Sequence, residues 1–228
     1  MLKEILSKYK IILASKSPRR QFLLKELGLD FEIRVKEVDE SFPENLRAEK
    51  IAVHLCRKKA DVFRKKLNQN ELLITADTIV WINNKILNKP ADEKKAVSML
   101  KTLSGKMHRV FTAVCIATDR KEKTFFVKTK VYFKKLSDKE IKFYVKNFQP
   151  FDKAGAYGAQ ECLPAGMNPC SSEEIKFLKK IRNTELIEKS KNQKMKAEIE
   201  HIIKKIDGSY FNVMGLPMKE LYEELIRF

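Results

Sequence analysis

Residues 10–28 read KIILASKSPRRQFLLKELG, and this stretch sets the fold class. Its first five residues form the short apolar run of a buried strand, and residues 21–27 have the apolar spacing of a helix that ends at Gly28. Between them, Ser17 suits the N-cap and Pro18 suits the first helical position. A strand that leads into a helix through a short turn is typical of an α/β fold.

The same alternation continues along the chain. Residues 31–35, 71–82, 110–117 and 123–133 are expected strands, and residues 45–66, 92–103 and 137–147 are expected helices. The last of these helices opens with Ser137-Asp-Lys-Glu140, which is the signature of a capping box. We therefore predict an α/β fold in which helices flank a mixed central sheet.

Residues 161–205 differ from the rest of the chain. A Pro- and Gly-containing loop over 163–169 leads to Ser171, which can cap a helix, and apolar residues then recur at helical spacing. These are Leu178, Ile181, Met195, Ile199, Ile202 and Ile206. We expect a surface helix or a helical hairpin, inserted within a single domain that spans residues 1–228.

Composition narrows the class of protein. The 228 residues carry 47 Lys and Arg against 30 Asp and Glu, a net charge of +17, and the 43% hydrophobic content is enough for a packed core. The charge favours a polyanionic partner, which could be nucleic acid, an anionic membrane surface or a small phosphate compound. No apolar run is long enough to span a membrane, and no signal peptide is recognisable. The four cysteines fit no zinc spacing, so we expect free thiols and a cytoplasmic location: Cys56, Cys115, Cys162 and Cys170.

The turn over residues 14–20, ASKSPRR, is a candidate phosphate site. Backbone N–H groups at the start of a helix bind anions, and the guanidinium groups of Arg19 and Arg20 match phosphate oxygens. The alternative is a solvated basic turn.

Two acidic segments could take part in chemistry. Glu37-Val-Asp39-Glu40 could hold a hard divalent cation, or it could be a solvated acidic turn. Asp77 follows the apolar run 71–75, where a carboxylate is costly unless it is paired, bound to metal or used in catalysis. The adjacent Thr78 could be a sheet residue or a substrate contact.

Two lysines and one glycine-rich segment complete the candidates. Lys59 lies on an expected helix, and Lys89 precedes Pro90 in a turn that fixes its backbone. Residues 151–160 contain two glycines and three alanines that allow close approach of a ligand, and they end at Gln160. For this segment a tight packing turn is the alternative.

Taken together, these segments resemble the Maf family of nucleoside triphosphate pyrophosphatases. The motifs that carry the resemblance are Leu13–Arg20, Ala76–Val80, Lys89-Pro90, Ser104–Thr112, Asp152–Gly158 and Gly208–Pro217, in this order. The resemblance implies two lobes around a cleft, and hydrolysis of a nucleotide between its α- and β-phosphates with Mg²⁺ or Mn²⁺. It also implies a homodimer with no nucleic-acid or membrane partner.

The resemblance also implies residue roles. Phosphate binding is implied for Ser15, Arg19, Lys59 and Lys89. Metal binding is implied for Glu40 and Asp77, and Asp77 is also the implied proton acceptor. The specificity positions Arg20, Thr78 and Gln160 match the subclass that acts on dTTP and UTP rather than the one that prefers 7-methylguanosine triphosphate.

Segment 161–205 departs from the family pattern, because a much shorter connection is expected there. It could cap the cleft, enlarge a dimer interface or only lengthen a loop. Two rival functions remain open. One is a basic nucleic-acid-binding protein, although no such module is recognisable, and the other is a non-catalytic regulator of septum formation.

Overall fold

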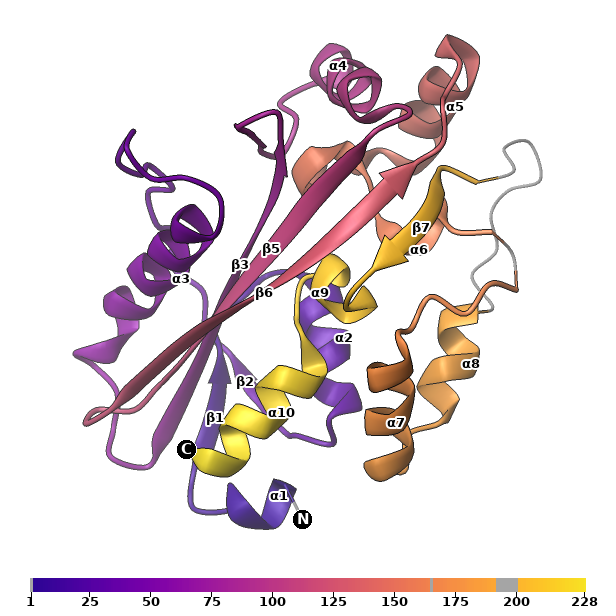
Figure 1. Ribbon diagram of the computed structural model, residues 1–228. Coiled ribbons are helices and arrows are strands. Elements are labelled where there is room, and N and C mark those ends of the chain that lie inside the picture. The colour runs from indigo at the N-terminus through magenta and orange to yellow at the C-terminus, as the bar shows by residue number, and fades with distance from the viewer. Residues whose placement is uncertain (1, 165, 192–200) are drawn as a thin grey trace. The chain divides into compact units, whose positions relative to one another are not determined.

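A mixed sheet forms the centre of the computed structural model, which describes residues 2–164, 166–191 and 201–228 (Figure 1). The strand order is β2-β1-β3-β5-β6-β7, and β4 pairs with β3. The strands are β1 (Lys10–Leu13), β2 (Glu32–Ile33), β3 (Glu71–Ile82), β4 (Lys85–Leu87), β5 (Met107–Ala117), β6 (Glu122–Phe133) and β7 (Ile203–Asp207). β1 is parallel to β2 and β3, whereas β4 is antiparallel to β3 and β7 is antiparallel to β6. The prediction of an α/β fold with a mixed sheet is confirmed.

Three of the described helices begin at a side-chain N-cap. Asp92 accepts a hydrogen bond from the backbone of Lys95, and Ser137 and Glu140 form the predicted capping box. The helices are α1 (Leu2–Ile5), α2 (Pro18–Glu26), α3 (Glu49–Arg64), α4 (Glu93–Leu103), α5 (Asp138–Phe148), α6 (Ala159–Cys162), α7 (Ser172–Lys180), α8 (Glu185–Lys191), α9 (Tyr210–Met214) and α10 (Met218–Arg227). Two short 3₁₀ turns cover Pro150–Asp152 and Ala154–Ala156.

The chain divides into two compact units. Unit 1 contains Met1–Thr78, Phe111–Val127 and Gly215–Phe228, and unit 2 contains Ile79–Val110 and Lys128–Met214. Strands β3, β5 and β6 therefore contribute residues to both units. The cleft implied by the family resemblance stays a prediction.

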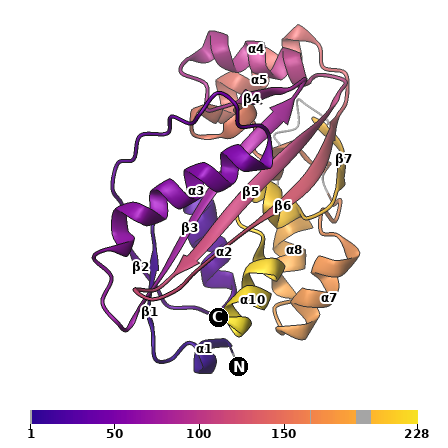
Figure 2. The same cartoon turned by 60° about the vertical axis from the view of Figure 1, so that its left-hand side comes forward.

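Unit 1 packs helices on both faces of its strands. Helix α3 lies on one face, and α2 and α10 lie on the opposite face (Figures 1 and 2). The apolar face of α3 is buried, and it consists of Ile51, Ala52, Leu55, Cys56, Ala60 and Phe63. Burying such a face stabilises a helix more than its intrinsic propensity does.

In unit 2, an aromatic cluster fixes the glycine-rich segment. The Nε2 atom of His108 lies 2.7 Å from the hydroxyl of Tyr157, and both rings pack edge-on against Phe133. Gly155 has φ +72° and would place a Cβ atom about 3.0 Å from the side chain of Val80, so a larger residue does not fit there. His108 therefore helps to hold this segment in place.

Segment 161–205 contains two helices that contact each other, α7 and α8. These helices also contribute to the core, because Phe177 and Leu178 of α7 and Leu186 of α8 are buried. The prediction of a helix is wrong at Ile206, which belongs to strand β7 and pairs with Val131 of β6. Ile202 is a loop residue before that strand, and Met195 and Ile199 lie outside the described residues.

In the described parts of the chain, none of the helices has the length and apolar character needed to cross a bilayer.

Candidate active site

Asp77 lies within β3, in a part of unit 1 where every residue from Glu71 to Asp77 is buried. Only 7% of the surface of Asp77 is exposed. Its Oδ1 atom accepts a hydrogen bond from the ammonium of Lys59, which α3 carries. Pairing was one of the three explanations for a carboxylate in this apolar run, and Lys59 supplies that pairing.

Lys59 also joins a second carboxylate to the site. Its Nζ atom lies 2.9 Å from Oε1 of Glu40, which precedes α3 in the chain. The side chains of Asp77 and Lys59 are 10% and 19% exposed, whereas that of Glu40 is 55% exposed. One ammonium therefore connects a buried carboxylate to a solvated one.

The environment shifts the pKa values of this cluster. Burial raises the pKa of Asp77 above its usual value, and the positive charges of Lys59 and Arg20 oppose that rise. Burial alone would lower the pKa of Lys59, but Asp77 and Glu40 raise it. A carboxyl group with a raised pKa beside a specific cation is typical of catalytic sites.

Arg20 and Thr78 are also held together. Arg20 donates from Nε to the carbonyl of Gly215 at 2.9 Å and from Nη1 to the carbonyl of Ala76 at 2.7 Å. Its Nη2 donates to the Thr78 hydroxyl at 3.0 Å, and that hydroxyl lies 2.9 Å from the hydroxyl of Thr112. Arg20 is thus oriented by the protein rather than solvated on a basic turn.

The turn before α2 differs in detail from its prediction. Ser17 takes the N-cap position, but its side chain makes no capping hydrogen bond. Instead, the hydroxyl of Ser15 accepts from the backbone N–H of Ser17 at 3.2 Å, and the Ser15 carbonyl accepts from Gln21 at the same distance. Ser15 is 6% exposed and Arg19 is partly exposed. Phosphate binding by this turn stays a prediction.

The remaining predicted residues belong to unit 2. Lys89 is exposed and follows β4, and Gln160 is partly buried in α6. The cluster of Asp77, Lys59 and Glu40 lies in unit 1. The phosphate role of Lys89 and the base-specificity role of Gln160 therefore stay predictions.

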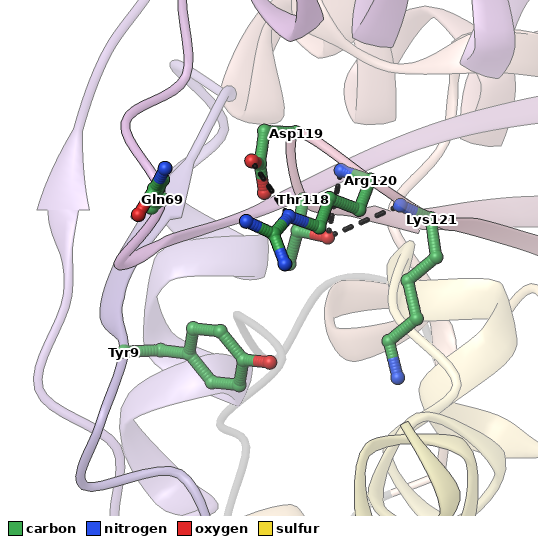
Figure 3. Close-up of a pocket in the computed structure, with 6 residues that line it drawn as sticks. All are labelled: Tyr9, Gln69, Thr118, Asp119, Arg120 and Lys121. Carbon is green, nitrogen blue, oxygen red and sulfur yellow. Dashed lines mark hydrogen bonds and ion pairs between the residues drawn. The ribbon is translucent and has the colours of Figure 1, made fainter.

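A surface pocket of about 300 Å³ lies elsewhere in unit 1 (Figure 3). Its lining residues are Tyr9, Gln69, Thr118, Asp119, Arg120 and Lys121. The pocket shares no residue with the Asp77 cluster, and we assign it no role in the chemistry.

A family model described as "Maf-like protein" matches residues 10–174. The chain belongs to this family. The match covers the Ser15 turn, Lys59 and Asp77, and it ends at Glu174 within segment 161–205.

Several relatives of this Maf-like chain are named dTTP/UTP pyrophosphatase. One from Bacteroides thetaiotaomicron is 43% identical over 96% of both chains. One from Flavobacterium johnsoniae is 43% identical over 99% of this chain and 98% of its own, and one from Parabacteroides distasonis is 40% identical over 99% of both. A structure of the Staphylococcus aureus Ham1 protein is 13% identical and covers 54% of this chain and 71% of its own, with a TM-score of 0.38.

The family resemblance implies a divalent metal ion at the Maf-like site. Within residues 2–164, 166–191 and 201–228, no group of three or more His, Cys, Asp or Glu side chains could hold a metal ion. Asp77 and Glu40 do converge on Lys59, and carboxylate oxygens suit Mg²⁺, which is commonly held by one or two carboxylates together with substrate phosphates and water. The donor set therefore fits a divalent cation that a nucleotide helps to hold.

Two contacts of the Maf-like site were not expected from the sequence. The Gly215 carbonyl contacts Arg20, and the Thr112 hydroxyl contacts Thr78. Both residues lie in motifs that carry the family resemblance. The sequence could have indicated the contact of Thr112, because its hydroxyl lies within the apolar strand 110–117 and buried polar groups usually have a partner. The carbonyl of Gly215 carried no such signal.

Proposed function

We propose that this Maf-like chain is a nucleoside triphosphate pyrophosphatase that hydrolyses dTTP and UTP to the monophosphate and pyrophosphate. The observation that carries the proposal is the buried carboxylate of Asp77, paired with Lys59, which also binds Glu40. The names of relatives that are 40–43% identical over nearly their whole length support the substrate class.

Asp77 is the proposed proton acceptor. Its raised pKa brings the carboxylate nearer to the proton affinity that a general base needs at neutral pH. In its ionised form it orients the attacking water toward the α-phosphorus and accepts a proton from it. Before nucleotide binds, Lys59 holds this carboxylate through the hydrogen bond to Oδ1.

The cations of unit 1 are proposed to stabilise the leaving pyrophosphate. Arg19 and Lys59 supply positive charge, and the turn at Ser15 supplies backbone N–H groups at the start of α2. Phosphoryl transfer depends mainly on such positioning and charge neutralisation.

Glu40 and Asp77 are the residues that would hold Mg²⁺ or Mn²⁺. Such a cation, when bound, lowers the pKa of its water and neutralises charge on phosphate oxygens. The exposed side chain of Glu40 leaves room for water and phosphate ligands on its side of the site.

Arg20 and Thr78 are proposed to determine the preference for the base. The carbonyl oxygens of thymine and uracil accept hydrogen bonds, and the guanidinium of Arg20 and the hydroxyl of Thr78 can donate them. The three protein acceptors around Arg20 fix its orientation before substrate binds.

The test is a product analysis by ³¹P NMR with Mg²⁺ or Mn²⁺. The panel contains dTTP, UTP, CTP, ATP, GTP and 7-methylguanosine triphosphate. We expect monophosphate and pyrophosphate, fastest from dTTP and UTP. Fastest turnover of 7-methylguanosine triphosphate would overturn the base assignment, and release of orthophosphate with a diphosphate would overturn the reaction. The homodimer and the cytoplasmic location stay predictions.

A further inference from the structure

Lys59 lies between the two carboxylates that are proposed to bind the divalent cation. Its ammonium contacts Oδ1 of Asp77 and lies 2.9 Å from Oε1 of Glu40, the two carboxylates proposed to bind metal. The pair carries two negative charges, and Lys59 supplies one positive charge between them. Leaving a buried carboxylate without a cation is costly, so this contact stabilises Asp77 in the nucleotide-free site.

A lysine can take this position and also leave it. Its ammonium is a compact charge on a flexible four-carbon stem, so it can move between partners more easily than the planar guanidinium of arginine. One of its two partners, Glu40, is already half exposed. Phosphate oxygens of a bound nucleotide offer the released ammonium a new set of acceptors.

We propose that Lys59 is an internal competitor of the divalent cation: it holds Asp77 and Glu40 while the site lacks metal and is released to the triphosphate when metal and nucleotide enter together. The inference rests on the proposed function for the second half of this exchange. The first half concerns only Lys59 and its two carboxylates. It predicts weak metal affinity without nucleotide, even though two carboxylates converge.

The adjacent residue provides a matched control. Lys58 lies next to Lys59 on α3, and its Nζ atom is 2.9 Å from Oδ2 of Asp39, the neighbour of Glu40. The side chains of Lys58 and Asp39 are 32% and 71% exposed, which is more than those of Lys59 and Glu40. Replacing either lysine by glutamine removes the same charge from the same helix, but only Lys59 contacts both proposed metal ligands.

The first experiment measures Mn²⁺ binding without nucleotide by electron paramagnetic resonance, at mildly alkaline pH. In Lys59→Gln we expect affinity about ten- to a hundredfold tighter than in wild type, the range equivalent to one charge-assisted hydrogen bond. In Lys58→Gln we expect a much smaller change. Unchanged or weaker Mn²⁺ binding in Lys59→Gln would overturn the proposal, because Lys59 would then support the ligands rather than compete for them.

A second measurement uses the wild-type chain and does not depend on the folding of a variant. Brief acetylation of lysines, read by mass spectrometry, reports how free each ammonium is. Saturating Mn²⁺ should increase the acetylation rate of Lys59 severalfold and leave that of Lys58 nearly constant. Equal protection of Lys59 with and without Mn²⁺ would also overturn the proposal.

These results separate this inference from the proposed function. Pyrophosphate release from dTTP by wild type, combined with unchanged Mn²⁺ affinity in Lys59→Gln, would reject the competitor role and leave the activity standing. Tighter Mn²⁺ binding in Lys59→Gln, without hydrolysis of any triphosphate by wild type, would reject the activity and leave the competitor role standing.

Discussion

The hydroxyl of Thr78 links two side chains of the proposed base-recognition site. It accepts from Nη2 of Arg20 and lies 2.9 Å from the hydroxyl of Thr112. Replacing it with a group of the same shape but without the oxygen leaves both partners short of a hydrogen bond. A site built on such contacts discriminates strongly between substrates.

The Thr78→Val variant should therefore lose base discrimination. We expect the ratio of kcat/KM for dTTP to that for ATP to fall by about tenfold or more, since one hydrogen bond to a charged group contributes about 1.5–3 kcal/mol. Thr124→Val, on β6, is the control and should keep the ratio. An unchanged ratio in Thr78→Val would remove Thr78 from base recognition.

His108 makes the stability of the fold depend on pH. Burial lowers its pKa from 6.5 to about 3, so the unfolded chain binds a proton that the folded chain rejects. The contribution of neutral His108 is therefore fully present above pH 6.5 and is lost as the pH falls toward 3.

Urea unfolding at several pH values tests this assignment. Between about pH 6.5 and pH 3, His108 should lower the free energy of unfolding by about 1.4 kcal/mol for each unit that the pH falls. In His108→Gln the slope should be smaller by that amount, because glutamine does not titrate and can still bind Tyr157. Equal slopes in the two proteins would mean that another group titrates.

At the scale of elements, Glu174 fastens segment 161–205 to the rest of unit 2. Its Oε1 atom accepts from the Ser209 hydroxyl at 2.7 Å and from the Phe211 N–H at 3.0 Å. Its Oε2 atom accepts from the Tyr210 N–H at 3.1 Å and completes the capping box of α7 with Ser171. The carboxylate is 2% exposed, so one side chain joins α7 to the start of α9.

Glu174→Gln should destabilise the protein. The amide would turn a donor toward groups that themselves donate, and the loss of a buried carboxylate from such a network should cost about 2–4 kcal/mol. The adjacent Glu173 is 60% exposed, and Glu173→Gln should change the free energy of unfolding by less than about 0.5 kcal/mol. Urea unfolding of both variants measures the difference, and equal stabilities would show that α7 is not anchored through Glu174.

How much of the elements could be predicted depended on their local pattern. Helix α3 has a continuous apolar face and α5 has its capping box, and both were predicted within a few residues of their ends. The four-residue spacing of Ile202 and Ile206 predicts a helix where the structure has strand β7, because the register of β7 comes from pairing with β6. The role of Glu174 as an anchor was also invisible locally, because its partners lie 35 to 37 residues away.

In the candidate site too, only features with a local sequence pattern could be predicted. Asp77 could be predicted because a carboxylate in an apolar strand is anomalous on its own, and its contact with Lys59 resolves the anomaly. The contact between Lys59 and Glu40 and the carbonyl contacts of Arg20 depend on the fold, and no pattern in the sequence indicates them.

For the whole molecule, the four cysteines agree with the expected free thiols. All four are buried, and none forms a disulfide. Burial raises the pKa of Cys56 and Cys170 to about 12 and that of Cys115 to about 11. Because the thiolate is the reactive form, these groups should be inert in the folded protein.

Thiol titration with Ellman's reagent at mildly alkaline pH checks this prediction. The native protein should react far more slowly than the protein in guanidinium chloride, where all four thiols become available. Rapid reaction of even one thiol in the native protein would mean that one of these cysteines is accessible.

The net charge of +17 attracts any polyanion, so binding alone cannot identify the substrate. Affinity for DNA should fall steeply with added salt if it comes from scattered lysines. The proposed chemistry at the α-phosphorus depends on the Asp77 cluster as well, so turnover separates an enzyme from a basic protein that only binds.

Pyrophosphate release from dTTP by wild type, Asp77→Asn and Asp61→Asn, with Mg²⁺ or Mn²⁺ present, tests the proposed role of Asp77. Asp61 is an exposed carboxylate of α3 and serves as the control. We predict that Asp77→Asn folds but loses about a hundred- to ten-thousandfold in turnover, as expected for removal of a general base, while Asp61→Asn keeps wild-type turnover. A well-folded Asp77→Asn protein that releases pyrophosphate at nearly the wild-type rate would show that Asp77 is not the base.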